Sequence, residues 1–128
     1  MTVGTDTYIL PADALVYLRK MTMDGTADYF AALTEEQQER FLADALIELE
    51  AIPKPGQKWN LWQPLDFPRY ACGTKYGYET PEEVGKAQAL EAGALLMCEI
   101  AGRKREGKTL ASKRAEDLLP FVGAGLKY

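Results

Sequence analysis

The residues of this chain that could do chemistry are carboxylates and thiols, because the sequence contains no histidine. Histidine is the most common general base and metal ligand, and without it neither Cys72 nor Cys98 has an imidazole to activate its thiol. The cysteines lack CxxC spacing, so we expect free thiols in a reducing compartment. The sequence predicts a protein that is not an enzyme and that has no cofactor and no metal site.

Two pairs of adjacent carboxylates have a simpler explanation than catalysis. Glu35 and Glu36 follow Thr34 in "TEEQQER", and Glu82 and Glu83 follow Pro81 in "TPEE". Acidic side chains in a first helical turn interact favourably with the helix dipole. A metal site would need more oxygen ligands from elsewhere. We interpret both pairs as solvated helix starts.

Basic residues cluster late in the chain, at "RKREGK" (103–108) and "SKR" (112–114), although the formal net charge is −4. We interpret residues 103–108 as a solvated helix end, and keep Arg103, Lys104 and Arg105 as candidates for a position near DNA. Tyr76 and Tyr78 in "KYGY" could stack on bases, as aromatic residues of single-strand binders do. The acidic balance counts against a freely diffusing DNA binder. No glycine-rich phosphate loop is present.

Hydrophobic spacing predicts the helices that must position these residues. The chain of 128 residues has the length of one domain. Apolar spacing predicts helices at 11–21, shortly after Asp24-Gly25, at 34–51 and at 80–101. Capping boxes mark the starts of the last two helices. Thr34 is the cap of the first, with the Gln37 side chain reaching back to the Thr34 backbone N–H, and Thr80 is the cap of the second, with the Glu83 side chain reaching back in the same way. The predicted fold is mainly α: a small bundle of four to five helices, with a long aromatic loop or short β-hairpin between the two main helices.

Small residues recur along the last predicted helix, at Gly85, Ala89 and Gly93. Side chains of this size at a spacing of four let another backbone approach closely, and we expect tight packing inside the domain. No apolar run reaches the ~18 residues of a membrane span. The first twenty residues do not resemble a signal peptide, so we expect a cytoplasmic protein without membrane contact.

The loop "NLWQPLDFPR" (60–69) is too apolar to be left in water. One interpretation is that its apolar side chains, together with Trp59, fold back as a lid, each contributing roughly 1.5–3 kcal/mol on burial. The alternative is contact with a neighbouring subunit, since Trp, Tyr and Arg dominate interface energetics. Both hold if Phe67 and Pro68 face inward while Trp62 and Arg69 lie at a contact.

The order of these segments resembles a known family. An opening "TYILPADALVYL" precedes the capped helix, and "PLDFPR" precedes the alanine-rich helix. This pattern is similar to the tailed-phage head–tail connector (adaptor, head-completion) family, which includes relatives labelled DnaT-like single-stranded-DNA-binding proteins. The matching positions are Tyr8, Ile9, Ala14 and Tyr17 in the opening, and Leu65, Phe67, Pro68 and Arg69 before the last helix.

The resemblance implies a structural virion protein. It would form a ring of about twelve subunits on the portal protein and would meet a tail or stopper protein around a DNA channel. The implied location is the virion neck, with the host cytoplasm during assembly. The alternative is a single-stranded-DNA-binding replication protein of the DnaT-like kind.

These expectations divide the chain into a helical connector domain with an N-terminal extended arm (1–109) and a C-terminal docking tail (110–128). The apolar end of the tail would be costly to leave exposed. Candidates for the subunit interface are Tyr8, Trp59, Trp62, Phe67, Arg69, Tyr76 and Tyr78. Candidates for docking on the portal are Phe121, Val122, Leu126 and Tyr128.

Overall fold

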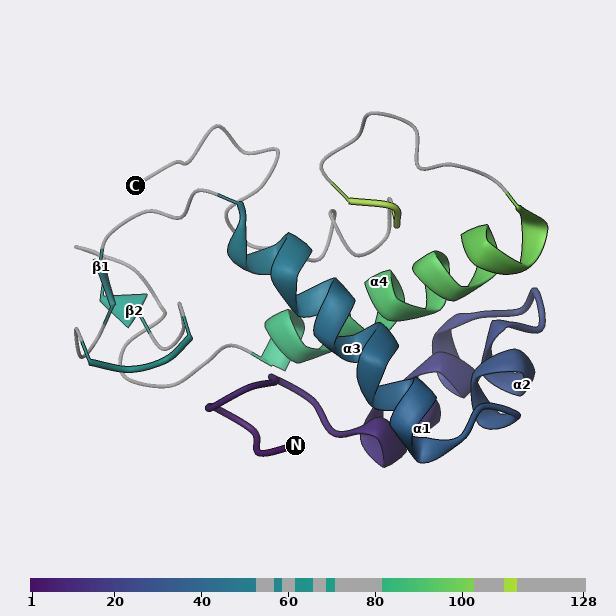
Figure 1. Ribbon diagram of the computed structural model, residues 1–128, viewed down its shortest axis with the longest axis horizontal. Coiled ribbons are helices and arrows are strands. Elements are labelled where there is room, and N and C mark those ends of the chain that lie inside the picture. The colour runs from purple at the N-terminus through teal and green to yellow at the C-terminus, as the bar shows by residue number, and fades with distance from the viewer. Residues whose placement is uncertain (53–56, 59–61, 66–68, 71–81, 103–109, 113–128) are drawn as a thin grey trace.

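Four helices packed together form the body of the computed structural model, which describes residues 1–52, 57–58, 62–65, 69–70, 82–102 and 110–112 (Figure 1). The helices are α1 (Pro11–Met21), α2 (Thr26–Ala31), α3 (Glu35–Glu50) and α4 (Glu82–Ala101). α4 contacts each of the other three helices. This arrangement confirms the predicted mainly-α bundle. In the described part of the chain, no helix is both long enough and apolar enough to cross a bilayer.

The start of α3 confirms the first capping box. The Thr34 hydroxyl accepts a hydrogen bond from the Gln37 N–H at 3.2 Å, and the Gln37 side chain accepts one from the Thr34 N–H at 3.0 Å. Two otherwise unpaired donors of the first turn are satisfied in this way. α3 buries Leu42, Ala45 and Leu49 on one face, as the spacing predicts. The second capping box begins at Thr80 and Pro81, which lie outside the described residues.

Helix α4 is the central element of the bundle. Nearly every residue from Val84 to Gly93 is buried, so α4 has no broad solvent-facing side over this stretch. The helix ends at Gly102, whose positive φ of 64° fits the left-handed conformation of a C-terminal cap. The predicted end of this helix at residue 101 is therefore confirmed.

The chain between α3 and α4 contains a short antiparallel ribbon. It consists of β1 (Gln57–Lys58) and β2 (Arg69–Tyr70), with Gln57 opposite Tyr70 and Lys58 opposite Arg69. The ribbon agrees with the hairpin expected in this connection. The aromatic segment 75–80 lies outside the described residues.

The first ten residues differ from the extended arm that the sequence suggested. Residues 2–7 close into a turn, in which the Gly4 N–H donates to the Thr7 carbonyl at 2.8 Å and the Thr2 N–H donates to the Asp6 carboxylate at 2.8 Å. Gly4 has a φ of 87°, which a glycine adopts without strain. Leu10 is extended and leads directly into α1.

Gln88 on α4 joins three separate segments of the chain. Its side chain is fully buried. Its carbonyl oxygen accepts from the Tyr8 N–H at 2.8 Å, and its Nε2 donates to the Thr7 hydroxyl and to the Leu42 carbonyl, both at 2.9 Å. One amide therefore fixes the N-terminal segment and α3 against α4.

Glu91, one turn further along α4, holds the segment that follows the helix. Its side chain is fully buried. One carboxylate oxygen accepts from the Ala111 N–H at 2.9 Å and the other accepts from the Ser112 N–H at 2.8 Å. The preceding Leu110 is fully buried in the core. Residues 110–112 are thus attached to the helical body.

The small residues of α4 mark the places where other segments come closest. A Cβ atom at Gly85 would lie 3.0 Å from the Tyr8 carbonyl oxygen, and one at Gly93 would lie 2.8 Å from Cγ2 of Thr26 and 3.1 Å from Cδ2 of Leu18. Ala89 between them is fully buried. The predicted tight packing within the domain is confirmed.

We expect Gln88→Leu to destabilise the protein by about 3 kcal/mol, because it leaves the Tyr8 N–H and the Thr7 hydroxyl without their buried partner. Urea unfolding followed by circular dichroism measures the change. Glu99→Leu is the matched control on the exposed end of the same helix, and its effect should stay within about 0.5 kcal/mol. Equal unfolding midpoints for Gln88→Leu and the wild type would contradict this role for Gln88.

We expect Gly93→Ala to destabilise the fold by about 1–3 kcal/mol through overpacking, although alanine is the better helix former. Thr26→Ser removes the methyl group that the new Cβ would meet and keeps the hydroxyl that donates to Asp24. The double variant should therefore recover part of the lost stability in thermal unfolding. Gly93→Ala would refute the packing argument if it raised the melting temperature.

Candidate functional site

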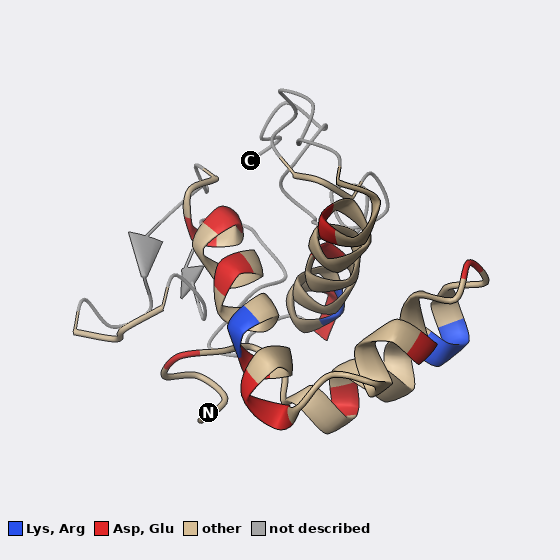
Figure 2. Ribbon diagram, turned by 45° about the vertical axis from the view of Figure 1, so that its right-hand side comes forward, with Lys and Arg blue, Asp and Glu red and all other residues tan. Residues whose placement is uncertain are grey.

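Charge is unevenly divided between the helices and the rest of the chain. The four helices carry twelve acidic residues and only four basic ones, which are Arg19, Lys20, Arg40 and Lys86. Figure 2 shows acidic positions along each helix and few basic ones. The other eleven of the 15 basic residues lie outside these four helices. The outer face of the helical body is therefore a poor surface for a polyanion.

Two of the four helical basic residues pair with acidic neighbours. Arg19 lies 3.9 Å from Asp28, and both side chains are largely exposed. Lys86 lies 3.1 Å from Glu82 across one helical turn. The hydrogen bond from Lys86 to Glu82 raises the pKa of this ammonium group above its ordinary value. These pairs further reduce the attraction of the helices for phosphates.

The connection between β1 and β2 contains one exposed and one buried apolar residue. Trp62, in the connection between β1 and β2, has 91% of its surface exposed. Three residues later Leu65 is buried in the core, and the Gln63 side chain donates to the Leu65 carbonyl at 2.8 Å. The connection is therefore attached to the body at Leu65, while most of the Trp62 surface is exposed. Lys58 and Arg69 face each other in register on the two strands.

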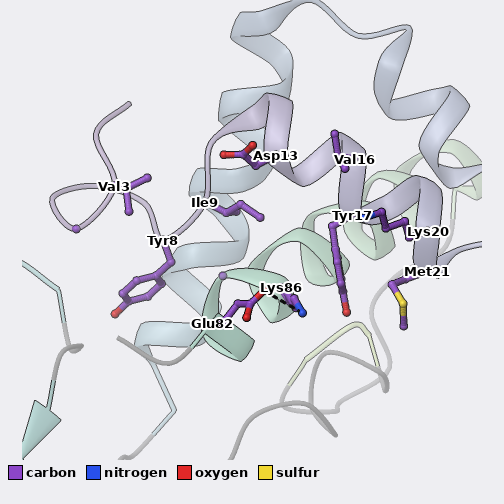
Figure 3. A pocket seen from close by; sticks show the side chains of 12 residues that line it. Val3, Tyr8, Ile9, Asp13, Val16, Tyr17, Lys20, Met21, Glu82 and Lys86 are labelled. Atoms are coloured by element: carbon purple, nitrogen blue, oxygen red, sulfur yellow. Dashed lines mark ion pairs between the residues drawn. The ribbon is translucent and has the colours of Figure 1, made fainter. Parts of the chain in front are cut away.

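A groove of about 610 Å³ lies between the N-terminal segment, α1 and the first turns of α4 (Figure 3). Its apolar lining includes Val3, Ile9, Val16 and Met21. Val3 and Val16 are each about half exposed. Charged side chains from α1 and α4 also line it, and the Lys86 ammonium lies 5.4 Å from the centre of the Tyr17 ring.

The described residues show no group of three or more acidic or cysteine side chains that could hold a metal ion. Glu35, Glu36, Glu82 and Glu83 are all exposed. Their positions at helix starts confirm the solvated interpretation.

The structure places three of the predicted site residues. Tyr8 is only 8% exposed and its hydroxyl donates to Glu50 at 3.1 Å, so most of this side chain is used inside the subunit. Trp62 is exposed, and Arg69 lies in β2. The remaining candidates lie outside the described residues: Trp59, Phe67, Tyr76, Tyr78, Arg103, Lys104, Arg105, Phe121, Val122, Leu126 and Tyr128.

Neither the groove nor the buried polar residues of α4 follow from the sequence pattern. Gln88 and Glu91 stand among alanines and other apolar residues, and that context is the one signal that could have marked them as buried. The groove combines residues from two parts of the chain that are far apart in sequence, Val3 to Met21 and Glu82 to Lys86, so no local motif predicts it.

The fold and surface together define a small helical protein with acidic helices and an exposed tryptophan, Trp62, in the connection between β1 and β2. A comparison with protein families matches residues 1–119 to the family described as "Putative DnaT-like ssDNA binding protein". The chain belongs to this family. No curated protein and no solved structure matched the chain in the other two comparisons.

Proposed function

We propose that the protein binds single-stranded DNA without catalysing a reaction, and that it does so through segments outside its four helices. The segregation of charge carries this proposal: the helices are acidic, whereas most lysines and arginines stand in the segment between α3 and α4 or after α4. The family description supports the same ligand.

The aromatic content of these segments favours a single strand over a duplex. Unpaired bases expose faces on which aromatic side chains stack, and each stacked base contributes about 1–3 kcal/mol. Phosphate contacts add a term that falls as salt rises. Tyr76 and Tyr78 stand beside Lys75 in the sequence, which makes them candidates for such contacts.

The test is the binding of a fluorescent oligothymidylate to the full chain, followed by anisotropy between 20 and 200 mM salt, with the duplex form of a mixed sequence as comparison. We expect binding that weakens steeply with salt, because neutralised phosphates release their counterions. Tyr76→Ala or Tyr78→Ala should weaken it. No binding at the lowest salt would rule the function out.

A second candidate is a head–tail connector of a tailed-phage particle, which the order of motifs suggests. The structural observation that favours it is the apolar groove beside the N-terminal segment, together with the exposed Trp62, since both fit protein contacts. In this function residues 1–109 form the ring subunit, residues 110–128 form the docking tail, and the basic 103–105 segment lies near the DNA channel. The portal and a tail or stopper protein are the partners.

The connector function predicts that deletion of residues 120–128 abolishes docking on the particle and spares the fold. These residues lie beyond the range that the family model matches. Circular dichroism and urea unfolding of the shortened chain should equal those of the full chain. Cryo-microscopy of particle necks should show density for the full chain and none for the shortened one. Unfolding of the shortened chain would instead make residues 120–128 part of the core.

A further inference from the structure

We propose that Glu91 is a positioning residue for single-stranded DNA, because it holds residues 110–112 on the helical body. The phosphate contacts come from three basic residues on either side of this tripeptide: Lys108, Lys113 and Arg114. This inference rests on the proposed DNA binding and adds to it the buried side chain that keeps part of the basic sequence in place.

The first argument is that the attachment fixes the register of the segment to a single residue. The two oxygens of the Glu91 carboxylate accept from consecutive backbone groups, the Ala111 N–H at 2.9 Å and the Ser112 N–H at 2.8 Å. Leu110, directly before them, is fully buried. A leucine side chain alone could enter the core from more than one backbone position, but two directed hydrogen bonds admit only one.

The second argument is the chemistry of the attaching group. Glu91 is fully buried, and burial of a carboxylate is unfavourable unless hydrogen bonds compensate for the lost water. An apolar side chain would pack against Leu110 at lower cost. A carboxylate suits a site that must bind two neighbouring N–H groups together, since a side-chain amide offers only one oxygen. The choice of residue therefore specifies position in addition to packing.

The third argument is the charge on both sides of the attachment. Lys113 directly follows residues 110–112, and Lys108 comes two residues before them. Because consecutive Cα atoms are about 3.8 Å apart, both backbones lie within about 8 Å of the attached residues. Residues 103–114 contain six basic residues and one acidic residue, and all of them lie in the range that the family model matches.

The attachment favours binding through conformational entropy. A basic segment that is free to move must be ordered when a strand binds, and this ordering reduces the affinity. Residues next to an attached tripeptide have already lost part of this freedom in the free protein. Glu91 therefore raises the affinity without contacting the strand.

The first test is Glu91→Gln in the full chain, measured by the anisotropy of a fluorescent oligothymidylate. We expect binding about tenfold weaker, because the released residues must be ordered again. Charge alone predicts the opposite change, since the variant is one unit less negative. The slope of log affinity against log salt should equal that of the wild type, because the number of phosphate contacts is the same.

A second variant loosens the attachment without changing α4. Ala111→Pro removes the N–H that donates to Glu91, and it should also weaken binding with an unchanged salt slope. Ala111→Ser keeps this N–H and is the matched control, with a change of less than about twofold. Circular dichroism checks that each variant is folded at the temperature of the measurement. If Glu91→Gln is not folded there, Ala111→Pro decides the test.

A third pair of variants tests the phosphate contacts themselves. Lys113→Ala/Arg114→Ala should lower the salt slope by about 1.4, since two phosphates are no longer neutralised. The control Lys20→Ala/Arg40→Ala removes the same charge from α1 and α3 and should leave the slope unchanged.

The outcomes separate this inference from the function on which it rests. If the wild type binds no oligonucleotide, both fail. If the wild type binds and the folded Glu91→Gln and Ala111→Pro variants bind as tightly or more tightly, the proposed function stands and the positioning role is wrong. The role is also wrong if Lys113→Ala/Arg114→Ala keeps the wild-type slope, because the phosphates are then bound elsewhere on the chain.

Discussion

The buried amide of Gln88 is the interaction on which the arrangement of the chain depends. It forms three hydrogen bonds to groups that are distant in sequence, one on α3 and two in the N-terminal segment. An amide has a donor side and an acceptor side, so it can join two segments only in one relative position. A leucine of similar volume would fill the space without specifying that position.

The close approach of the N-terminal segment to α4 makes this interaction possible. The Tyr8 carbonyl lies over Gly85, and the α1–α2 corner lies over Gly93, at distances that a side chain would prevent. The N-terminal segment can reach the Gln88 side chain because Gly85, one turn earlier, has no side chain there. Packing and hydrogen bonding therefore depend on each other along one side of α4.

Much of the fold follows from local patterns in the sequence. The capping box at Thr34, the apolar face of α3, the end of α4 at Ala101 and the close packing at Gly85 and Gly93 were all predicted, because each rests on a pattern within one helix. The burial of Gln88 and Glu91 was not predicted. A helix that is covered on most sides has no polar face, so its sequence does not show which residues point inward.

The candidate sites were harder to predict than the helices. The sequence marked Trp62 and Arg69 as contact residues, but the pairing of Arg69 with Lys58 depends on the strand register. The groove brings together Val3, Val16 and Lys86, whose proximity is a property of the tertiary fold. Such sites become visible only once the helices have been placed in space.

The attachment of residues 110–112 to Glu91 has a consequence for how this protein can vary. The start of the C-terminal segment is set by a side chain in the middle of α4, and not by the length of the chain between the two. Loop-closure entropy changes slowly with length. Insertions or deletions between Gly102 and Leu110 can therefore accumulate during evolution, while the segment after Ser112 still departs from the same point on the molecule.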